Sequence, residues 1–273
     1  MSEKKNLTTK ETFDLAVQNH QKNNFKAAED LYNQILEIDP NHIKTIFFLG
    51  TLSVQTKNFD RAKQMLQKTI QAQPNNVDAY NNLGVVFKEF EEFQKAKDCF
   101  EKVIQIQPKH VDALNNLGNV FKQLNEPQKA INYYQKAIEI EPSYINAHQN
   151  LMDVCEKTNQ ITELKDAVSN ARTFFKDNSI IKLYEGILLS RNEKFVEAKN
   201  YLESILFETK EIKNEILRVS TLAKCYDRIG GTDKAFNYFK KANLLTQSTK
   251  MKNFDKNKYL QEIKIRSEFF KKS

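Results

Sequence analysis

The sequence predicts an all-α protein, a solenoid of about seven helix pairs, and three observations lead to this fold class. The stretch NNLGVVFKEFEEFQKAKDCFEKVIQIQP, residues 81–108, is written again as NNLGNVFKQLNEPQKAINYYQKAIEIEP at residues 115–142. Prolines and glycines recur on the same period, at Pro40, Pro74, Pro108 and Pro142, and at Gly50, Gly84, Gly118 and, two periods further on, Gly186. Apolar residues follow helical spacing inside each copy. A period of this length indicates stacked repeats whose units cover their neighbours.

Each unit is predicted to contain two tightly joined helices. In the unit that ends at Pro108, the first run of apolar residues at helical spacing is Leu83, Val86 and Phe87, and the second is Phe93, Ala96, Phe100, Val103 and Ile104. Pro108 cannot continue the second helix because it lacks the amide hydrogen and clashes with the preceding turn. Gly84 costs about 1 kcal/mol in a helix interior relative to Ala, so we expect the small Ala96 to let the two backbones approach closely.

The pattern resembles the tetratricopeptide repeat (TPR) family, whose small residues and terminal proline occupy fixed positions of the repeating unit. The third and fourth repeats carry it most fully, with Leu83, Gly84, Phe87, Ala96, Phe100 and Pro108, and with Leu117, Gly118, Phe121, Ala130, Tyr134, Ala137 and Pro142. The resemblance implies stacked antiparallel helix pairs that form a right-handed superhelical solenoid.

The chain divides into four predicted segments. Residues 1–8 form a polar leader, residues 9–151 hold well-formed repeats one to four running into repeat five, and residues 152–247 hold degenerate repeats five to seven. Residues 248–273 read as a basic amphipathic helix, with Tyr259, Ile263, Phe269 and Phe270 among Lys and Arg. We expect this helix to cap the last pair; a membrane-surface helix or a nucleic-acid arm would use the same charges, but interspersed Asp255, Glu262 and Glu268 argue against both.

Composition favours a cytoplasmic, soluble chain. The formal charge is +7, of which the segment from Ser248 contributes +5 through eight basic and three acidic residues, so the repeats are close to neutral. No run approaches the roughly 20 apolar residues of a membrane span, and the start lacks the apolar stretch of a secretory signal. Cys99, Cys155 and Cys225 are dispersed free thiols, as expected in a reducing compartment. We expect no membrane partner, and neither nucleic acid nor a small molecule is favoured.

No catalytic, metal-binding or cofactor-binding set of residues is present, so we expect a non-enzymatic chain without a cofactor. His20, His42, His110 and His148 are isolated, and no HExxH or Cys and His cluster has metal-ligand spacing. His42 and His110 share one repeat position after the proline, and we expect them to be polar residues at helix starts. The chain has no GxGxxG or GxxxxGK[ST] phosphate loop.

The remaining candidate site is the groove that the first helices of TPR pairs line. Its predicted residues are Asn81, Asn82, Val85, Lys88, Asn115, Asn116, Asn119, Lys122, Gln149, Asn150 and Asp153. Asn82, Asn116 and Asn150 stand one per repeat and resemble the asparagine ladder of O-linked N-acetylglucosamine transferases, which implies capture of an extended peptide through its backbone. The same asparagines could instead hold neighbouring repeats together. The two-lysine carboxylate clamp of chaperone-binding TPRs is not supported, because the relevant positions carry Asp78, Asn81, Asp112 and Asn115.

A second resemblance concerns the end of the chain. The run AKCYDRIGGTDKAFNYFKKANLLTQ, followed by NFDKNKYLQEIKIRSEFF, is similar to the junction of bacterial TPR-sulfotransferase proteins. No phosphosulfate loop resembling PxxRSGTT follows. The sequence therefore predicts an interaction scaffold or adaptor that binds an extended polypeptide. The alternative is the substrate-presenting or oligomerising TPR region of a sulfotransferase or glycosyltransferase whose catalytic domain is absent from this chain.

Overall fold

The computed structural model describes residues 7–207 and 211–248, and every regular element in these ranges is an α-helix. The helices of these ranges are α1 (Thr9–Gln21), α2 (Phe25–Ile38), α3 (Ile43–Gln55), α4 (Phe59–Ala72), α5 (Val77–Glu89), α6 (Phe93–Ile106), α7 (Val111–Gln123), α8 (Pro127–Ile140), α9 (Ile145–Lys157), α10 (Ile161–Phe174), α11 (Ser179–Arg191), α12 (Phe195–Glu203), α13 (Ile212–Arg228) and α14 (Thr232–Ser248). The predicted all-α fold of helix pairs is confirmed. The predicted C-terminal helix lies, beyond Ser248, outside the described residues.

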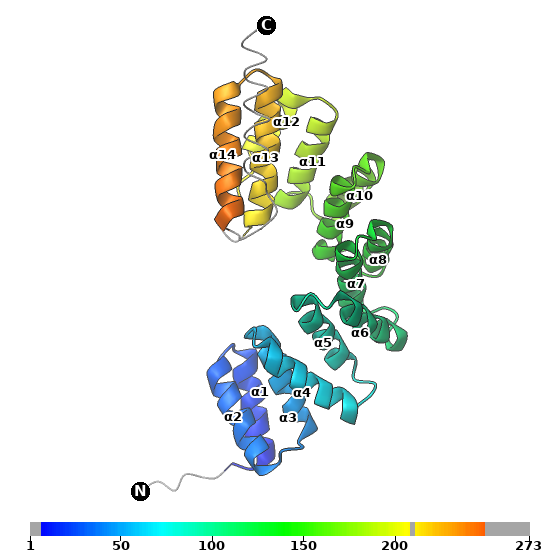
Figure 1. Ribbon diagram of the computed structural model, residues 1–273, viewed down its shortest axis with the longest axis vertical. Helices are drawn as coiled ribbons and strands as arrows, with labels where there is room; N and C mark the ends of the chain where they lie inside the picture. The colour runs from blue at the N-terminus through cyan, green and yellow to red at the C-terminus, as the bar shows by residue number, and fades with distance from the viewer. Residues whose placement is uncertain (1–6, 208–210, 249–273) are drawn as a thin grey trace, which may run out of the picture. The chain divides into compact units, whose positions relative to one another are not determined.

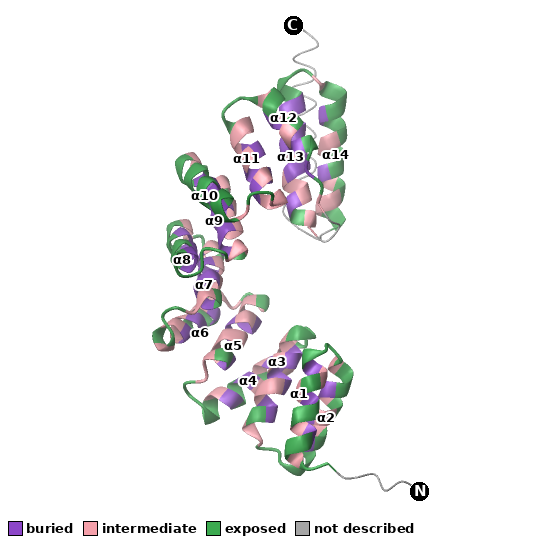
Figure 2. Cartoon of the chain, turned by 180° about the vertical axis from the view of Figure 1, so that it is seen from behind, coloured by how far each residue is buried: buried purple, intermediate pink, exposed green. Residues whose placement is uncertain are grey.

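The chain forms two compact units, residues 1–154 and 155–273, and α9 runs from the first into the second. In the first unit, α1 to α8 pack as four successive pairs, each against the next (Figure 1). In the second unit, α11 packs on α12 and α13 packs on α14. Figure 2 shows the buried residues as patches along the helices of each unit, with exposed residues covering the remaining faces and the turns.

The helix starts reproduce the sequence period residue for residue. The first helices α1, α3, α5, α7, α9 and α11 each have 13 residues and begin at one constant interval, from Thr9 to Ser179. The second helices α2, α4, α6, α8 and α10 each have 14 residues and begin on the same period. α13 begins at Ile212, and Asn214 is buried within its first turn.

One residue of each turn inside a pair adopts the left-handed backbone conformation. These residues stand one repeat apart, have φ between 58° and 61°, and are Asn23, Lys57, Glu91, Asn125, Asn159 and Glu193. Asn tolerates this conformation, whereas side chains such as Glu and Lys meet a steric cost there. The last pair uses Gly230, with φ 82°, at the corresponding turn. Some of these turns therefore store local strain that glycine would relieve.

The recurring helix glycines make room for a large side chain on the second helix of the same pair. A Cβ built on Gly84 would lie 2.7 Å from the Phe100 ring, and one on Gly118 would lie 2.4 Å from the Tyr134 ring. Gly50 and Gly186 face Leu66 and Leu202 in the same way. The structure therefore corrects the expected role of Ala96, because the close approach that requires Gly84 is to the Phe100 ring.

A buried arginine organises the irregular part of the second unit, where α12 has only 9 residues. Arg218 is 8% exposed and donates hydrogen bonds to the Leu202 carbonyl at 3.0 Å and to both carboxylate oxygens of Glu215. Burial alone would raise the pKa of Glu215, but hydrogen bonds from Arg218 and Lys241 outweigh it and hold that pKa below its ordinary value. Arg218 thus satisfies a carbonyl near the end of α12 and ties it to α13.

Substitution of Gly118 by Ala is expected to destabilise the fold. The new methyl group would overlap the Tyr134 ring, and overpacking of this kind costs about 1–3 kcal/mol, which exceeds the gain in helix propensity of about 1 kcal/mol. Equilibrium urea unfolding of Gly118→Ala measures the effect. Gln135→Ala, on the exposed side of α8, is the matched control and should change stability by less than about 0.5 kcal/mol. Equal stabilities for Gly118→Ala and the parent chain would contradict the packing role.

Substitution of Glu91 by Gly is expected to stabilise the fold. Glu91 is exposed and has φ 59°, so removing its Cβ relieves strain and should raise the free energy of unfolding by about 0.5–1 kcal/mol. Asn125→Gly is the control, with a smaller gain because Asn already tolerates the conformation. Urea unfolding midpoints of the two variants decide the order; a larger gain for Asn125→Gly would be inconsistent with this account.

Candidate peptide-binding groove

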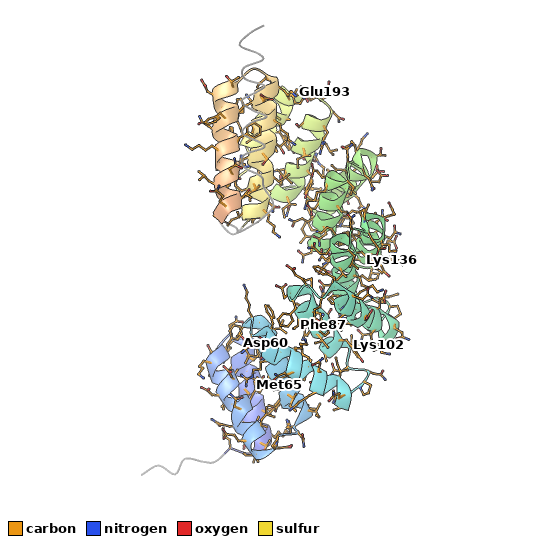
Figure 3. All side chains as sticks on the ribbon, in the orientation of Figure 1. Asp60, Met65, Phe87, Lys102, Lys136 and Glu193 are labelled. Atoms are coloured by element: carbon orange, nitrogen blue, oxygen red, sulfur yellow. The ribbon has the colours of Figure 1, made fainter. Side chains whose placement is uncertain are left out.

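The eleven predicted groove residues lie on α5, α7 and α9, all within the first unit. On α5, residues 81, 82, 85 and 88 fall on one side of the helix because their spacings approximate one or two turns. α7 presents residues 115, 116, 119 and 122 in the same register, and α9 presents residues 149, 150 and 153. Lys102 on α6 and Lys136 on α8 point away from α5 and α7, which separates the outer face from the predicted groove (Figure 3).

Two of the three ladder asparagines bond to the preceding first helix. Asn82 donates from Nδ2 to Thr51 Oγ1 on α3 at 3.1 Å, and Asn150 donates from Nδ2 to Asn115 Oδ1 on α7 at 2.9 Å. Both bonds connect consecutive repeats, which is the role that repeat packing alone would give these side chains. The Asn116 side chain makes no hydrogen bond to any residue in the described ranges. The three ladder positions are therefore not equivalent in the folded chain.

Predicted groove residues on α7 and α9 bond to one another and to Tyr134 of α8. Asn115 is 6% exposed and accepts the bond from Asn150. Tyr134 donates from its hydroxyl to Asn119 Oδ1 at 2.9 Å, and Lys122 Nζ lies 3.3 Å from Asp153 Oδ2. Val85 and Gln149 are half-buried.

The α5 end contains polar groups that the described part of the chain leaves unused. Asn81 Oδ1 is buried without a hydrogen-bond partner, and the side chains of Lys88 and Asn116 form neither ion pairs nor hydrogen bonds with described residues. The register explains Lys88. One repeat later, its counterpart Lys122 pairs with Asp153. The residue one repeat before Asp153 is Asn119, so the position that could pair with Lys88 carries no charge. We call Asn81, Val85, Lys88 and Asn116 the open set.

The histidines have structural roles. Nδ1 of His42 accepts from the Thr45 amide at 3.3 Å, and Nδ1 of His110 accepts from the Ala113 amide at 3.2 Å. Both therefore cap helix starts, as expected. His20 is buried, and its Nε2 lies 2.9 Å from Gln55 Oε1. His148 is fully buried and donates from Nε2 to the Pro142 carbonyl at 2.9 Å.

The cysteines are poor nucleophiles in this fold. All three are buried, and burial raises the pKa of Cys99 to about 12 and that of Cys155 to about 11. Burial also raises the pKa of Cys225. The thiolate is the reactive form, so these groups remain protonated thiols near neutral pH. Among the described residues, no group of three or more His, Cys, Asp or Glu could hold a metal ion. No helix in those ranges is long and apolar enough to span a membrane.

Sequence models of the tetratricopeptide repeat match residues 20–84, 77–110 and 111–144. Residues 20–144 of the chain therefore match tetratricopeptide repeats. The crystal structure of MamA is 27% identical over 62% of this chain and 92% of that chain, with a TM-score of 0.56. A TPR protein of Parabacteroides merdae is 16% identical over 93% and 96% of the two chains, with a TM-score of 0.67. PilF of Pseudomonas aeruginosa is 19% identical over 71% and 88%, with a TM-score of 0.61. The last two likenesses show the fold alone.

A search of curated proteins gave no significant match. The TPR models match up to residue 144, and nothing in the comparisons supports the predicted sulfotransferase-type junction. Sequence reasoning also missed Thr51 and Tyr134, which bond to Asn82 Nδ2 and to Asn119 Oδ1. A hydroxyl residue at position 51 and a tyrosine at position 134 are visible in the sequence, but their partners follow only from the geometry between helices.

Protonation of His148 is expected to weaken the fold at acid pH. Burial lowers the pKa of His148 below 6.5, although the hydrogen bond to Pro142 opposes the shift. The unfolded chain, with an ordinary pKa, then binds the proton more readily than the folded chain. Stability is therefore fully present above about pH 6.5 and declines as the pH falls through and below it. The free energy of unfolding of the parent chain and of His148→Gln should be compared at pH 7.5 and 5.5.

The parent chain should lose more stability over that interval than His148→Gln, which has no imidazole to protonate. His110→Gln is the control, since the His110 ring is half-buried at a helix start. Identical pH dependence in the parent chain and His148→Gln would contradict the assignment.

Proposed function

We propose that this chain is an interaction scaffold that binds an extended segment of a partner polypeptide along α5 and α7. The observation that carries the proposal is the open set, whose amides and ammonium group the described fold leaves without partners. Lys88 and Asn116 are half-buried, and the Asn116 amide offers both a donor and an acceptor to a partner chain. A peptide N–H is the donor that an extended chain supplies at every second residue on one side.

The TPR architecture supports this function. Repeats that contact only their neighbours produce long surfaces lined by equivalent positions of successive helices. The open set belongs to two such helices, α5 and α7, in the part of the chain that the TPR models match. Each hydrogen bond would contribute only about 1 kcal/mol, so affinity depends on several contacts made together.

The proposal separates binding asparagines from packing asparagines. Asn82 and Asn150 are engaged in bonds between repeats, so their main contribution is to stability. Asn116, Asn81 and Lys88 have no such bonds in the described chain, so their contribution is to the partner. In place of a ladder of three equivalent peptide contacts, the proposal has one ladder asparagine, Asn116 on α7, together with Asn81 and Lys88 on α5.

Paired substitutions test this division. A partner polypeptide is first identified by affinity purification on the intact chain and then titrated by isothermal calorimetry. The double variant Lys88→Gln with Asn116→Ala should weaken its binding about tenfold or more, since two polar contacts of about 1 kcal/mol each are lost. Its urea unfolding should match that of the parent chain.

Two controls complete the experiment. Lys102→Gln changes a lysine on α6 that faces away from the groove and should leave binding unchanged. Asn82→Ala should lower the free energy of unfolding by about 0.5–1.5 kcal/mol with little effect on affinity measured well below the unfolding midpoint. Unaltered affinity of the Lys88 and Asn116 double variant would refute the proposed surface.

A further inference from the structure

One contact between repeats changes its chemistry in the second unit. At a fixed register near the end of the second helix, four successive repeats carry an aliphatic residue, and the fifth carries arginine: Leu36, Ile70, Ile104, Ile138 and Arg172. At a matching register of the next first helix, four repeats carry leucine and the fifth carries glutamate: Leu49, Leu83, Leu117, Leu151 and Glu185. Leu36 packs against the core cluster that contains Leu49. An apolar contact has thus been replaced by a charged pair at the contact of α10 with α11.

The charged pair is joined to a tyrosine, and the three side chains form what we call the polar joint. Arg172 Nη1 donates to Glu185, and the Tyr201 hydroxyl donates to the other carboxylate oxygen of Glu185. The Glu185 side chain is 15% exposed, whereas the Arg172 side chain is 62% exposed. The carboxylate is therefore held from two sides while most of the guanidinium remains open to solvent.

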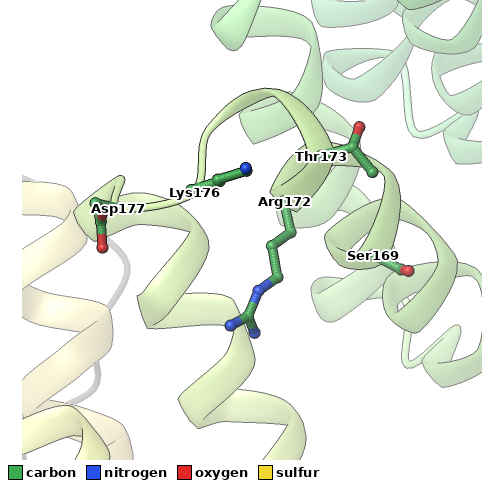
Figure 4. Close-up of a pocket in the computed structure, with 5 residues that line it drawn as sticks. All are labelled: Ser169, Arg172, Thr173, Lys176 and Asp177. Carbon is green, nitrogen blue, oxygen red and sulfur yellow. The ribbon is translucent and has the colours of Figure 1, made fainter.

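Arg172 stands between two hollows of the surface. The first has a volume of about 430 Å³. It is lined by the polar joint, by Lys165 and by the apolar residues Ile161, Leu188 and Leu189. The second, of about 380 Å³, adjoins Lys176 on the connection that follows α10. Figure 4 shows Arg172 extending from α10 towards the neighbouring helix, with Lys176 above it. The first hollow falls within the range of ligand sites, roughly 300–1,000 Å³.

The charges around the first hollow do not balance. Glu185 already accepts from Arg172 and Tyr201. Lys165 forms no ion pair with residues in the described ranges, and the Arg172 side chain makes no other hydrogen bond there. The guanidinium group has five N–H donors in a fork that suits a carboxylate. An apolar floor beside unused cationic donors fits an occupant that is apolar and anionic on one side.

We propose that this hollow binds an extended segment of a partner polypeptide that carries an apolar and a carboxylate side chain two residues apart. Side chains at i and i+2 of an extended chain point to the same side, whereas those at i and i+1 point to opposite sides. The apolar side chain packs on Leu188 and Leu189, and the carboxylate pairs with Arg172 and Lys165. The site lies in the second unit and is separate from the open set of the first.

Two capped peptides of identical composition test the geometry. Acetyl-SLSESLSES-amide places Leu and Glu two residues apart, and acetyl-SLESSLESS-amide places them next to each other. Fluorescence anisotropy of labelled peptides on the full chain should show at least fivefold tighter binding of the first. Because the contact is between exposed charges, raising the salt concentration should weaken that binding.

A double substitution removes the site while preserving the fold. Arg172→Ile with Glu185→Leu restores the residue types found at the other four contacts, and replacing an ion pair by packed apolar residues is often neutral or stabilising. This variant should keep or raise the thermal unfolding midpoint and bind acetyl-SLSESLSES-amide at least tenfold more weakly. Arg191→Gln, which breaks the Arg191–Glu156 ion pair elsewhere in the second unit, is the control and should leave peptide binding unchanged.

Every outcome of the peptide-binding experiments either supports or overturns the proposed site. Selective binding of acetyl-SLSESLSES-amide that the double variant loses supports the site. No binding by the parent chain, equal binding of the two peptides, or full binding by the folded double variant each overturns it. These outcomes are independent of Lys88 and Asn116, so this site and the proposed scaffold function can fail separately.

Discussion

The close approach of a helix glycine to a large side chain of its partner helix is the contact on which the pairs α3–α4, α5–α6, α7–α8 and α11–α12 depend. Gly84 lies against Phe100 and Gly118 lies against Tyr134, at separations that leave no room for a methyl group. This contact fixes how near the two helices of a pair come, and therefore where every other side chain on those helices lies. The first helices then present equivalent positions in successive repeats, so that helices alone, without loops, can form a continuous surface.

Most of the backbone follows from the sequence period. The positions of Pro108 and Gly84 locate the end of one helix and the closest contact within the pair, and the structure places helix starts on the same period. The reason is physical, because helix lengths, turns and terminating prolines act locally and repeat with the sequence. The left-handed turn residues were not predicted, since Lys57 and Glu91 have side chains that do not favour that conformation.

The state of the groove side chains could not be read from the sequence. Asn82, Asn116 and Asn150 are the same residue at the same register, yet two bond to a neighbouring helix and one does not. The difference depends on the residue that the next first helix places nearby. Lys122 has Asp153 at that position, whereas Lys88 has Asn119. The sequence therefore predicted which helices carry the candidate residues, and the pairing between helices was needed to tell which of their side chains have partners within the described chain.

The fixed spacing of helices and turns has a consequence for how this chain can change in length. Because α3, α5, α7 and α9 begin at equal intervals along the chain, gain or loss of one complete unit keeps the helix register between the remaining neighbours. Removal of a single residue within a helix would instead turn all following positions of that helix by about 100° and misplace its glycine. Duplication and deletion of whole units are thus the mutational steps that this architecture tolerates. The charged contact of Arg172 with Glu185 marks a junction whose residues differ from those of the other repeats.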